Sequence, residues 1–310
     1  MDIELRGKVD LLTENYREVR RAFRWDGKKL NILEALLYSR TDKDVEFLRV
    51  KEIREFITKD KTNRKVFNRK FINRFSLLYD TDKDYTKEYE SIKYVYEFLI
   101  SKGFDEREET VLSSYMLVKR YTGVELQNRV NKLIEIKNSL GKDSVINYAL
   151  LSTLDKDIEE IKDEINKIKH LINESHGIDK ELCLSSLVQF MLDDKEITQN
   201  INNISKMANK IKEKKMPISK EIFPMIGVAN FIVKDIDEFV KELQYVYNDM
   251  KSRKIFKYFL NKNIKLMFSM AIILDKYVEE IRADLIDIDD ESEINTLLIL
   301  EECIVFSICS

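Results

Sequence analysis

The chain has 310 residues and a mass of 36.9 kDa, with 53 basic and 56 acidic residues and a formal net charge of -3. This near balance disfavours a protein that sheathes nucleic acid, because such a protein needs a net basic surface. Only 7 Gly and 2 Pro are available as turn formers, while 44% hydrophobic residues are enough for a continuous core. We therefore expect an all-α protein.

The sequence also predicts a cytoplasmic location. Residues 1–4 have neither the basic start nor the apolar stretch of a secretion signal. The most apolar segment, 297–308, is shorter than the roughly 20 residues that cross a bilayer and contains Glu301 and Glu302. The three cysteines, Cys183, Cys303 and Cys309, lack metal-site spacing, and we interpret them as reduced and buried.

A short apolar run is followed by a cluster of Asp and Lys residues, which we call a break. This pattern recurs along the chain, at roughly the 40-residue period of helical-hairpin repeats. Acidic side chains favour the amino end of a helix, where they complement the helix dipole. We therefore interpret each break as the start of the next helix. The breaks are Asp42-Lys43-Asp44, Asp82-Lys83-Asp84, Asp155-Lys156-Asp157, Asp193-Asp194-Lys195, Lys234-Asp235 and Asp275-Lys276.

In chain order, apolar residues at three- and four-residue steps predict about seven helical pairs, in which the second helix is the more apolar one. Asp26 is expected to cap the second helix of the first pair, and Asp105 with Glu108 has the spacing of a capping box. The pairs are 9–23 with 30–37, 45–58 with 64–79, 85–99 with 111–117, 130–136 with 145–150, 158–172 with 182–191, 197–207 with a helix after the turn 216–219, and 236–247 with 256–274.

Stacked pairs bury one another's apolar stripes, so the repeats predict antiparallel helical hairpins arranged as a HEAT-like α-α superhelix. No shift in composition marks a domain boundary. We expect residues 1–310 to form one continuous helical-repeat domain, with 278–310 as a C-terminal capping helical pair. The alternative fold is a compact multi-helix bundle.

Two basic clusters are the candidate sites for an anionic partner. In the first, the cations surround Phe67, Phe71 and Phe75, whose four-residue spacing favours a buried stripe with the cations on its solvated side. The alternative is a surface that contacts phosphate groups and stacks an aromatic ring. The candidate residues are Arg64, Lys65, Arg69, Lys70 and Arg74 in the first cluster, and Arg253, Lys254 and Lys257 in the second.

No motif of known chemistry is present. His170 and His176 are six residues apart, which does not suit two ligands on one helical turn. The HExxH, Walker and GxSxG patterns are absent, so we expect no metal and no cofactor, and no catalytic residue can be named. The isoleucine seam at 158–172 has nearly heptad spacing, which makes a homodimer a secondary prediction.

The residues Val9-Asp10-Leu11-Leu12, Asn15-Tyr16, Phe23, Trp25-Asp26 and Leu36-Leu37-Tyr38 resemble an uncharacterised bacterial family, domain of unknown function 4003. The resemblance extends over most of the chain, through apolar helical motifs of moderate specificity. It implies a bacterial cytoplasmic protein. It implies no activity, because the family carries no established catalytic residues.

Three functions follow as hypotheses. The first is a non-catalytic scaffold that binds a protein or peptide, since helical repeats form extended binding surfaces. The second is a HEAT-like protein that binds nucleic acid, with base-repair activity as its extension, suggested by the two basic clusters. The third is an enzyme that uses carboxylates within a helical bundle.

Overall fold

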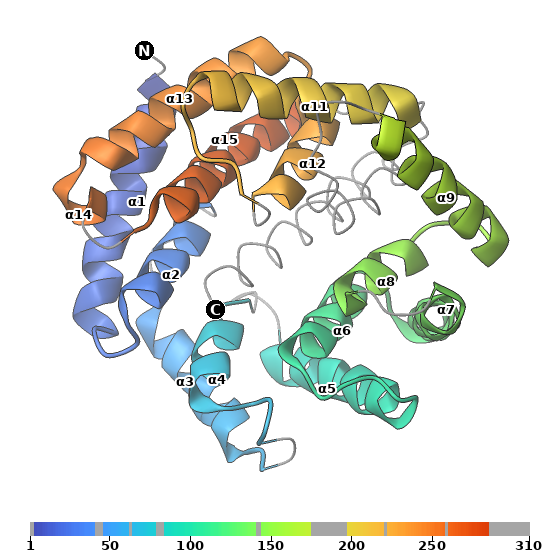
Figure 1. Ribbon diagram of the computed structural model, residues 1–310. Coiled ribbons are helices and arrows are strands. Elements are labelled where there is room, and N and C mark those ends of the chain that lie inside the picture. Colours follow the sequence, from blue (N-terminus) through green and yellow to red (C-terminus); the bar gives the residue numbers. More distant parts are fainter. Residues whose placement is uncertain are drawn as a thin grey trace.

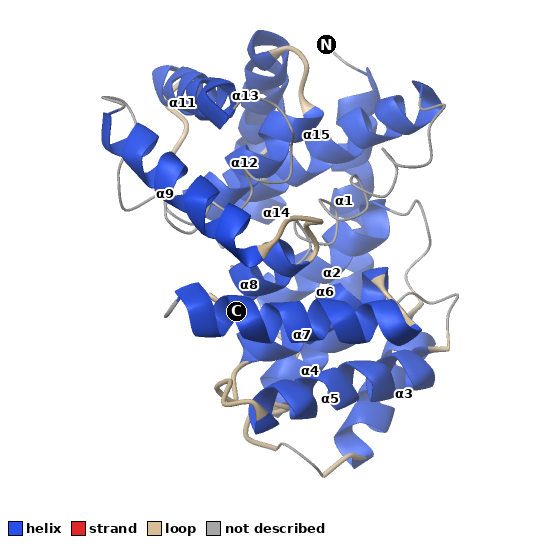
Figure 2. Cartoon of the chain, turned by 90° about the vertical axis from the view of Figure 1, so that its right-hand side faces the viewer, coloured by secondary structure: helices blue, strands red, loops and turns tan. Residues whose placement is uncertain are grey.

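The computed structural model describes residues 3–40, 46–61, 64–78, 84–140, 144–174, 197–219, 222–257 and 260–284. Within these ranges, 82% of the residues lie in 14 α-helices and no strand is present, which confirms the all-α prediction (Figure 2). No helix in the same ranges is both long and apolar enough to span a bilayer.

The helices in chain order are α1 (Ile3–Ala22), α2 (Lys28–Arg40), α3 (Phe47–Lys59), α4 (Arg69–Phe75), α5 (Tyr85–Ser101), α6 (Glu108–Arg120), α7 (Gly123–Leu140), α8 (Val145–Ser152), α9 (Ile158–Glu174), α11 (Ile197–Glu213), α12 (Phe223–Ile232), α13 (Ile236–Ser252), α14 (Lys254–Lys257) and α15 (Lys262–Asp284), with a 3-10 turn, η1 (Ser76–Leu78), after α4.

The helices pack as pairs in two layers. Contacts join α1 to α2, α5 to α6, α7 to α8, α11 to α12 and α13 to α15. First members of successive pairs also touch, as α5 touches α7 and α11 touches α13. Second members do the same, as α6 touches α8 and α12 touches α15. The first members form the outer layer of the molecule and the second members the inner layer (Figure 1).

The two layers differ in composition as the sequence predicts. The inner helices have continuous buried stretches: residues 110–117 of α6, 147–152 of α8 and 225–230 of α12 are all buried. In the outer helix α13, burial is confined to one stripe that contains Phe239, Leu243 and Val246. A helix covered on several sides must be apolar nearly all round, whereas an outer helix needs one apolar face.

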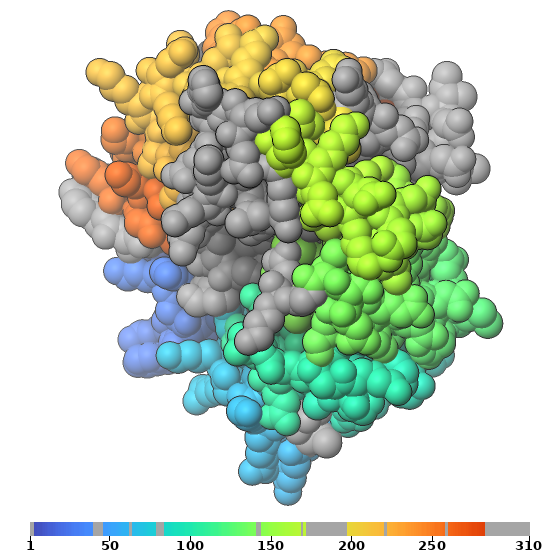
Figure 3. Space-filling view, turned by 45° about the vertical axis from the view of Figure 1, so that its right-hand side comes forward, coloured from blue at the N-terminus to red at the C-terminus, as the bar shows by residue number. Residues whose placement is uncertain are grey.

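The pairs follow one another round the molecule, and the last described helices lie against the first (Figures 1 and 3). The helix α1 touches both α13 and α15. Arg253, directly after α13, donates to Asp10 at 2.6 Å and to the Thr13 hydroxyl at 3.0 Å. Lys8 and Glu279 form an ion pair at 2.8 Å. This closure differs from a solenoid, in which each repeat touches only its neighbours, so a HEAT-like superhelix is not shown.

Three of the acidic breaks begin helices, as predicted. Asp84 accepts a hydrogen bond from the Thr86 backbone N–H at 3.1 Å at the start of α5. Asp157 and Glu160 form a reciprocal capping box at the start of α9, with both bonds at 2.8 Å. Asp235 caps α13 by accepting two backbone N–H bonds. The short polar side chain therefore satisfies N–H groups that the helix leaves unpaired.

Other predictions about helix ends are wrong. Asp275 and Lys276 lie inside α15, where Lys276 pairs with Glu242 on α13 at 2.6 Å. The expected capping box at Asp105 does not form, because α6 begins at Glu108 after an N-cap residue, Arg107, that makes no side-chain cap bond. The breaks at 42–44, 82–83 and 193–195, the helix 182–191 and most of the terminal pair 278–310 lie outside the described residues. The single-domain prediction stays a prediction.

Candidate functional site

The turn between α1 and α2 presents the single tryptophan of the chain to solvent. Gly27 has a φ of +93°, which residues with a Cβ rarely adopt. Phe23 is buried and packs against Phe47, with 5.7 Å between the ring centroids. Trp25 is 83% exposed, and the guanidinium of Arg24 lies 4.5 Å from its ring centroid. The buried Phe23 anchors the turn, and Trp25 projects from it.

Arg54 on α3 ties this turn to its neighbours. Its Nη1 donates to the Asp26 carboxylate at 2.5 Å, and its guanidinium lies 4.4 Å from the Phe23 ring centroid. It also donates to the Ser76 hydroxyl and to the Asn73 carbonyl, both at 3.2 Å. The second oxygen of Asp26 accepts from the Asn73 amide at 3.0 Å. Asp26, which we expected to cap α2, thus joins the turn to α3 and α4.

Glu34 on α2 lies beneath this network and is fully buried. Its nearest cation is Arg54, at 3.7 Å, and its oxygens have no hydrogen-bond partner among the described residues. Burial raises the pKa of Glu34 to about 8; Arg54 opposes the rise, and the Asp26 charge adds to it. Because desolvation penalises the ionised form, we expect this carboxyl to be largely protonated at neutral pH.

Above the network lies an open cavity of about 550 Å³, which we call the Trp25 cavity. Its cations Lys51, Lys59 and Arg69 make no ion pair with the described residues. Arg54 and Asp26 form part of its floor and neutralise each other. The lining residues are Ala22, Phe23, Trp25, Asp26, Lys51, Arg54, Glu55, Thr58, Lys59, Arg69 and Asn73.

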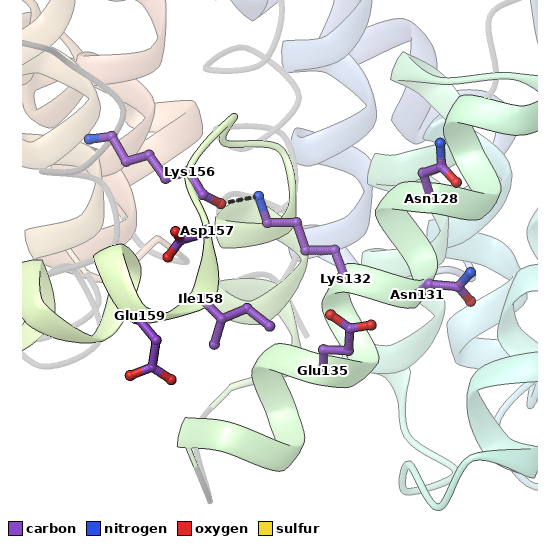
Figure 4. A pocket seen from close by; sticks show the side chains of 8 residues that line it. All are labelled: Asn128, Asn131, Lys132, Glu135, Lys156, Asp157, Ile158 and Glu159. Carbon is purple, nitrogen blue, oxygen red and sulfur yellow. Dashed lines mark hydrogen bonds between the residues drawn. The ribbon is translucent and has the colours of Figure 1, made fainter.

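A second cavity, of about 600 Å³, lies between α7 and the start of α9 (Figure 4). Lys132 points toward the carbonyl groups that follow α8, and its ammonium donates to Lys156 O at 2.5 Å and to Leu154 O. Burial lowers the pKa of Lys132, and the nearby Arg129 adds to this effect. The lining residues are Asn128, Asn131, Lys132, Glu135, Lys156, Asp157, Ile158 and Glu159.

The cations in and beside this second cavity have structural partners: Lys132 binds carbonyl groups, and Lys156 pairs with Glu164 at 3.0 Å. Arg129 donates to the carbonyl oxygens of Ser152, Thr153 and Leu154 at 3.2 to 3.3 Å, and to the Asp155 carboxylate at 2.6 Å. Cationic side chains at the carboxyl end of a helix bind carbonyl groups that have no partner within the helix. The second cavity thus lies where α8 is joined to α9, whereas the Trp25 cavity has three cations without an ion pair among the described residues and an exposed aromatic ring.

The first predicted basic cluster divides between core and surface. Phe67, Phe71 and Phe75 are buried and in ring contact, which confirms the preferred interpretation of the stripe. Arg74 is 7% exposed and forms two hydrogen bonds of 2.8 Å with Glu108, so its charge is used within the fold. Of the remaining residues, Arg64, Lys65, Arg69 and Lys70 are exposed, Lys65 pairs with Glu106 at 3.2 Å, and Arg69 lines the Trp25 cavity.

The second predicted cluster lies elsewhere in the closed circle of helices, at and just before α14 (Figure 1). Arg253 forms ion pairs with Asp10 on α1 and with Asp249 on α13, each at 2.6 Å, and so joins the last described helices to the first. Lys254 and Lys257 are exposed. The sequence therefore identified Arg69 as a residue of the candidate site, while Arg74 and Arg253 have structural roles.

The sequence prediction missed the basic residues that precede and follow the tryptophan in the chain. Residues 17–29 contain six cations and two acids, and this imbalance is visible in the sequence. All six cations are exposed, and they extend the positive surface along the end of α1 and the start of α2. They are Arg17, Arg20, Arg21, Arg24, Lys28 and Lys29.

Among the described residues, no group of three or more His, Cys, Asp or Glu side chains is arranged to hold a metal ion. His170 lies on α9, whereas His176 and the three cysteines fall outside the described residues. No curated protein and no solved structure matches the chain. A model of a family of proteins of unknown function, DUF4003, matches residues 15–303. The chain therefore belongs to the DUF4003 family.

Proposed function

We propose that this protein is a non-catalytic scaffold that binds a protein or peptide segment at the Trp25 cavity. The observation that carries the proposal is an indole that is 83% exposed, beside a cavity of about 550 Å³. Tryptophan and arginine supply much of the energy at protein interfaces, because a partner can desolvate a large ring and a planar cation together. Arg24 and Trp25 offer this combination, with the guanidinium 4.5 Å from the ring centroid.

The floor of the cavity supports the same function. Arg54, Asp26 and Asn73 are fixed by bonds between the turn, α3 and α4. A site that is already ordered loses less conformational entropy when a partner binds. The scaffold therefore needs little rearrangement to accept a segment.

A peptide array tests this proposal. Fluorescent protein is applied to an array of random dodecapeptides, and Trp25→Ala is compared with the unaltered protein and with Tyr94→Ala. Tyr94, on α5, is the matched control because it is an exposed aromatic residue outside the cavity. We expect Trp25→Ala to lose the bound peptides and Tyr94→Ala to keep them. Equal peptide binding by all three proteins would show that the Trp25 cavity is not the binding site.

The second candidate function is nucleic-acid binding, favoured by the same tryptophan and by Arg69. An exposed ring among cations can stack a base while the cations contact phosphate groups. Binding of single-stranded DNA would then fall steeply with salt concentration, and charge reversal at Arg69 would weaken it. Binding that is unchanged by salt and by this reversal would count against the function. Base repair stays an untested extension.

We also infer that the helical pairs are diverged copies of one hairpin repeat, as in HEAT-like proteins, and that the protein is cytoplasmic. The alternation of amphipathic outer and apolar inner helices supports the repeat origin. Cell fractionation tests the location. A protein partner is part of the proposal, and a homodimer through the face of α9 stays a secondary prediction.

A further inference from the structure

We propose that the segment held at the Trp25 cavity is acidic, that is, a stretch of protein or peptide rich in Asp or Glu. This inference rests on the proposed function, because it names the chemistry of the partner at that same site.

The charge that lines the cavity carries the inference. Arg54 and Asp26 neutralise each other at 2.5 Å, so they present little net charge to a partner. Lys51, Lys59 and Arg69 remain, and they make no ion pair with described residues. Glu55 is the one exposed acid among the lining residues. A segment with several carboxylates can form ion pairs with these three cations.

The surroundings strengthen this preference. Arg24 lies against Trp25, and the end of α1 and the start of α2, which flank the turn, carry further exposed cations. The whole chain carries a net charge of -3, so this positive surface is local. Local positive potential attracts an acidic partner and raises the rate of association, mostly at low salt concentration.

An acidic peptide fits the lining better than a nucleic acid does. Glu55 would repel phosphate groups and peptide carboxylates alike, but a peptide can also donate backbone N–H groups to this carboxylate, which a phosphate backbone cannot do. Phe23, the other lining aromatic residue, is buried with Arg54 over its ring, so Trp25 is the one exposed ring of this cavity. Single-strand binding sites commonly stack successive bases on several rings.

The intrinsic fluorescence of the chain provides the assay, because Trp25 is its only tryptophan. The full chain is titrated with octaglutamate, octaglutamine, octalysine and the oligonucleotide (dT)8. We expect octaglutamate alone to give a saturable change in fluorescence, and 0.5 M salt to abolish it. The double variant Lys59→Gln/Arg69→Gln should bind octaglutamate about tenfold more weakly.

The matched control is Lys254→Gln/Lys257→Gln, which removes the same charge from exposed residues on α14. It should bind octaglutamate as the unaltered protein does. Equal binding of octaglutamine would overturn the acidic partner and leave the peptide scaffold standing. Binding of (dT)8 without octaglutamate would overturn it in favour of nucleic acid. No response to any probe would overturn it as well, and the peptide array would then decide the proposed function separately.

Discussion

Replacing Glu34 by glutamine removes the ionisable group from beneath the Trp25 turn while keeping nearly the same volume. Glu34 is fully buried, 3.7 Å from Arg54, and its oxygens lack hydrogen-bond partners among the described residues. The glutamine side chain is neutral at every pH, as the glutamic acid is when protonated. The substitution therefore separates the effect of ionisation from that of packing.

The pKa of Glu34 sets the size and sign of the effect. Burial raises it from 4.5 to about 8, so the folded protein holds the proton more tightly than the unfolded chain does. The resulting stabilisation is complete below pH 4.5 and is lost as the pH rises toward 8. One pKa unit corresponds to about 1.4 kcal/mol, so full ionisation of Glu34 lowers the free energy of unfolding by about 5 kcal/mol in total. About half of this falls between pH 6 and pH 8.5.

Urea unfolding at pH 6 and pH 8.5 measures the effect. The free energy of unfolding of Glu34→Gln minus that of the unaltered protein should increase by about 2.5 kcal/mol between the two pH values. Glu55→Gln, an exposed carboxylate on α3, is the control and should show no such increase. If the free energies of unfolding of Glu34→Gln and of the unaltered protein changed equally between the two pH values, the conclusion that Glu34 is protonated in the fold would be refuted.

Three further substitutions test the contact between α1 and the segment after α13, and the contacts at the ends of α8 and α9. Arg253→Ala should lower the free energy of unfolding by about 2 kcal/mol, because it leaves carboxylates on α1 and α13 without their partner, and Lys254→Ala should not. Arg129→Ala should cost about 1 to 3 kcal/mol in urea unfolding, since the carbonyl groups of Ser152, Thr153 and Leu154, at the end of α8 and just after it, lose a donor. Asp157→Ala should cost about 1 kcal/mol by breaking the capping box of α9, with Asp163→Ala on the same helix as the neutral comparison.

Features that depend on near neighbours in the sequence were predicted well. Phe67, Phe71 and Phe75 recur at helical spacing, and they are buried as the periodicity indicates. Asp157 and Asp235 cap helices because the N–H groups that they bind lie two or three residues ahead. The apolar inner helices were also recognisable, because a helix that is covered on several sides needs apolar residues on several sides.

Features that depend on distant partners were not predictable in this way. Arg74 and Arg69 look alike in the sequence, but Arg74 bonds to Glu108 and Arg69 lines the Trp25 cavity. Asp26 has the position of a helix cap, yet it accepts from Arg54 and Asn73. Periodicity reports which face of a helix is buried. It does not report which carboxylate a given cation will meet.

The sequence by itself determined the all-α class, the alternation of amphipathic and apolar helices and several helix starts, because these follow from interactions within a few residues. Only the tertiary structure decided that α1 lies against α13 and α15, and that Arg74 and Arg253 form ion pairs while Lys51, Lys59 and Arg69 form none with the described residues. The physical reason is that ring closure and ion pairing depend on which helices come together in space. Arg253 and Asp10 meet across 243 residues, a separation that no local pattern can encode.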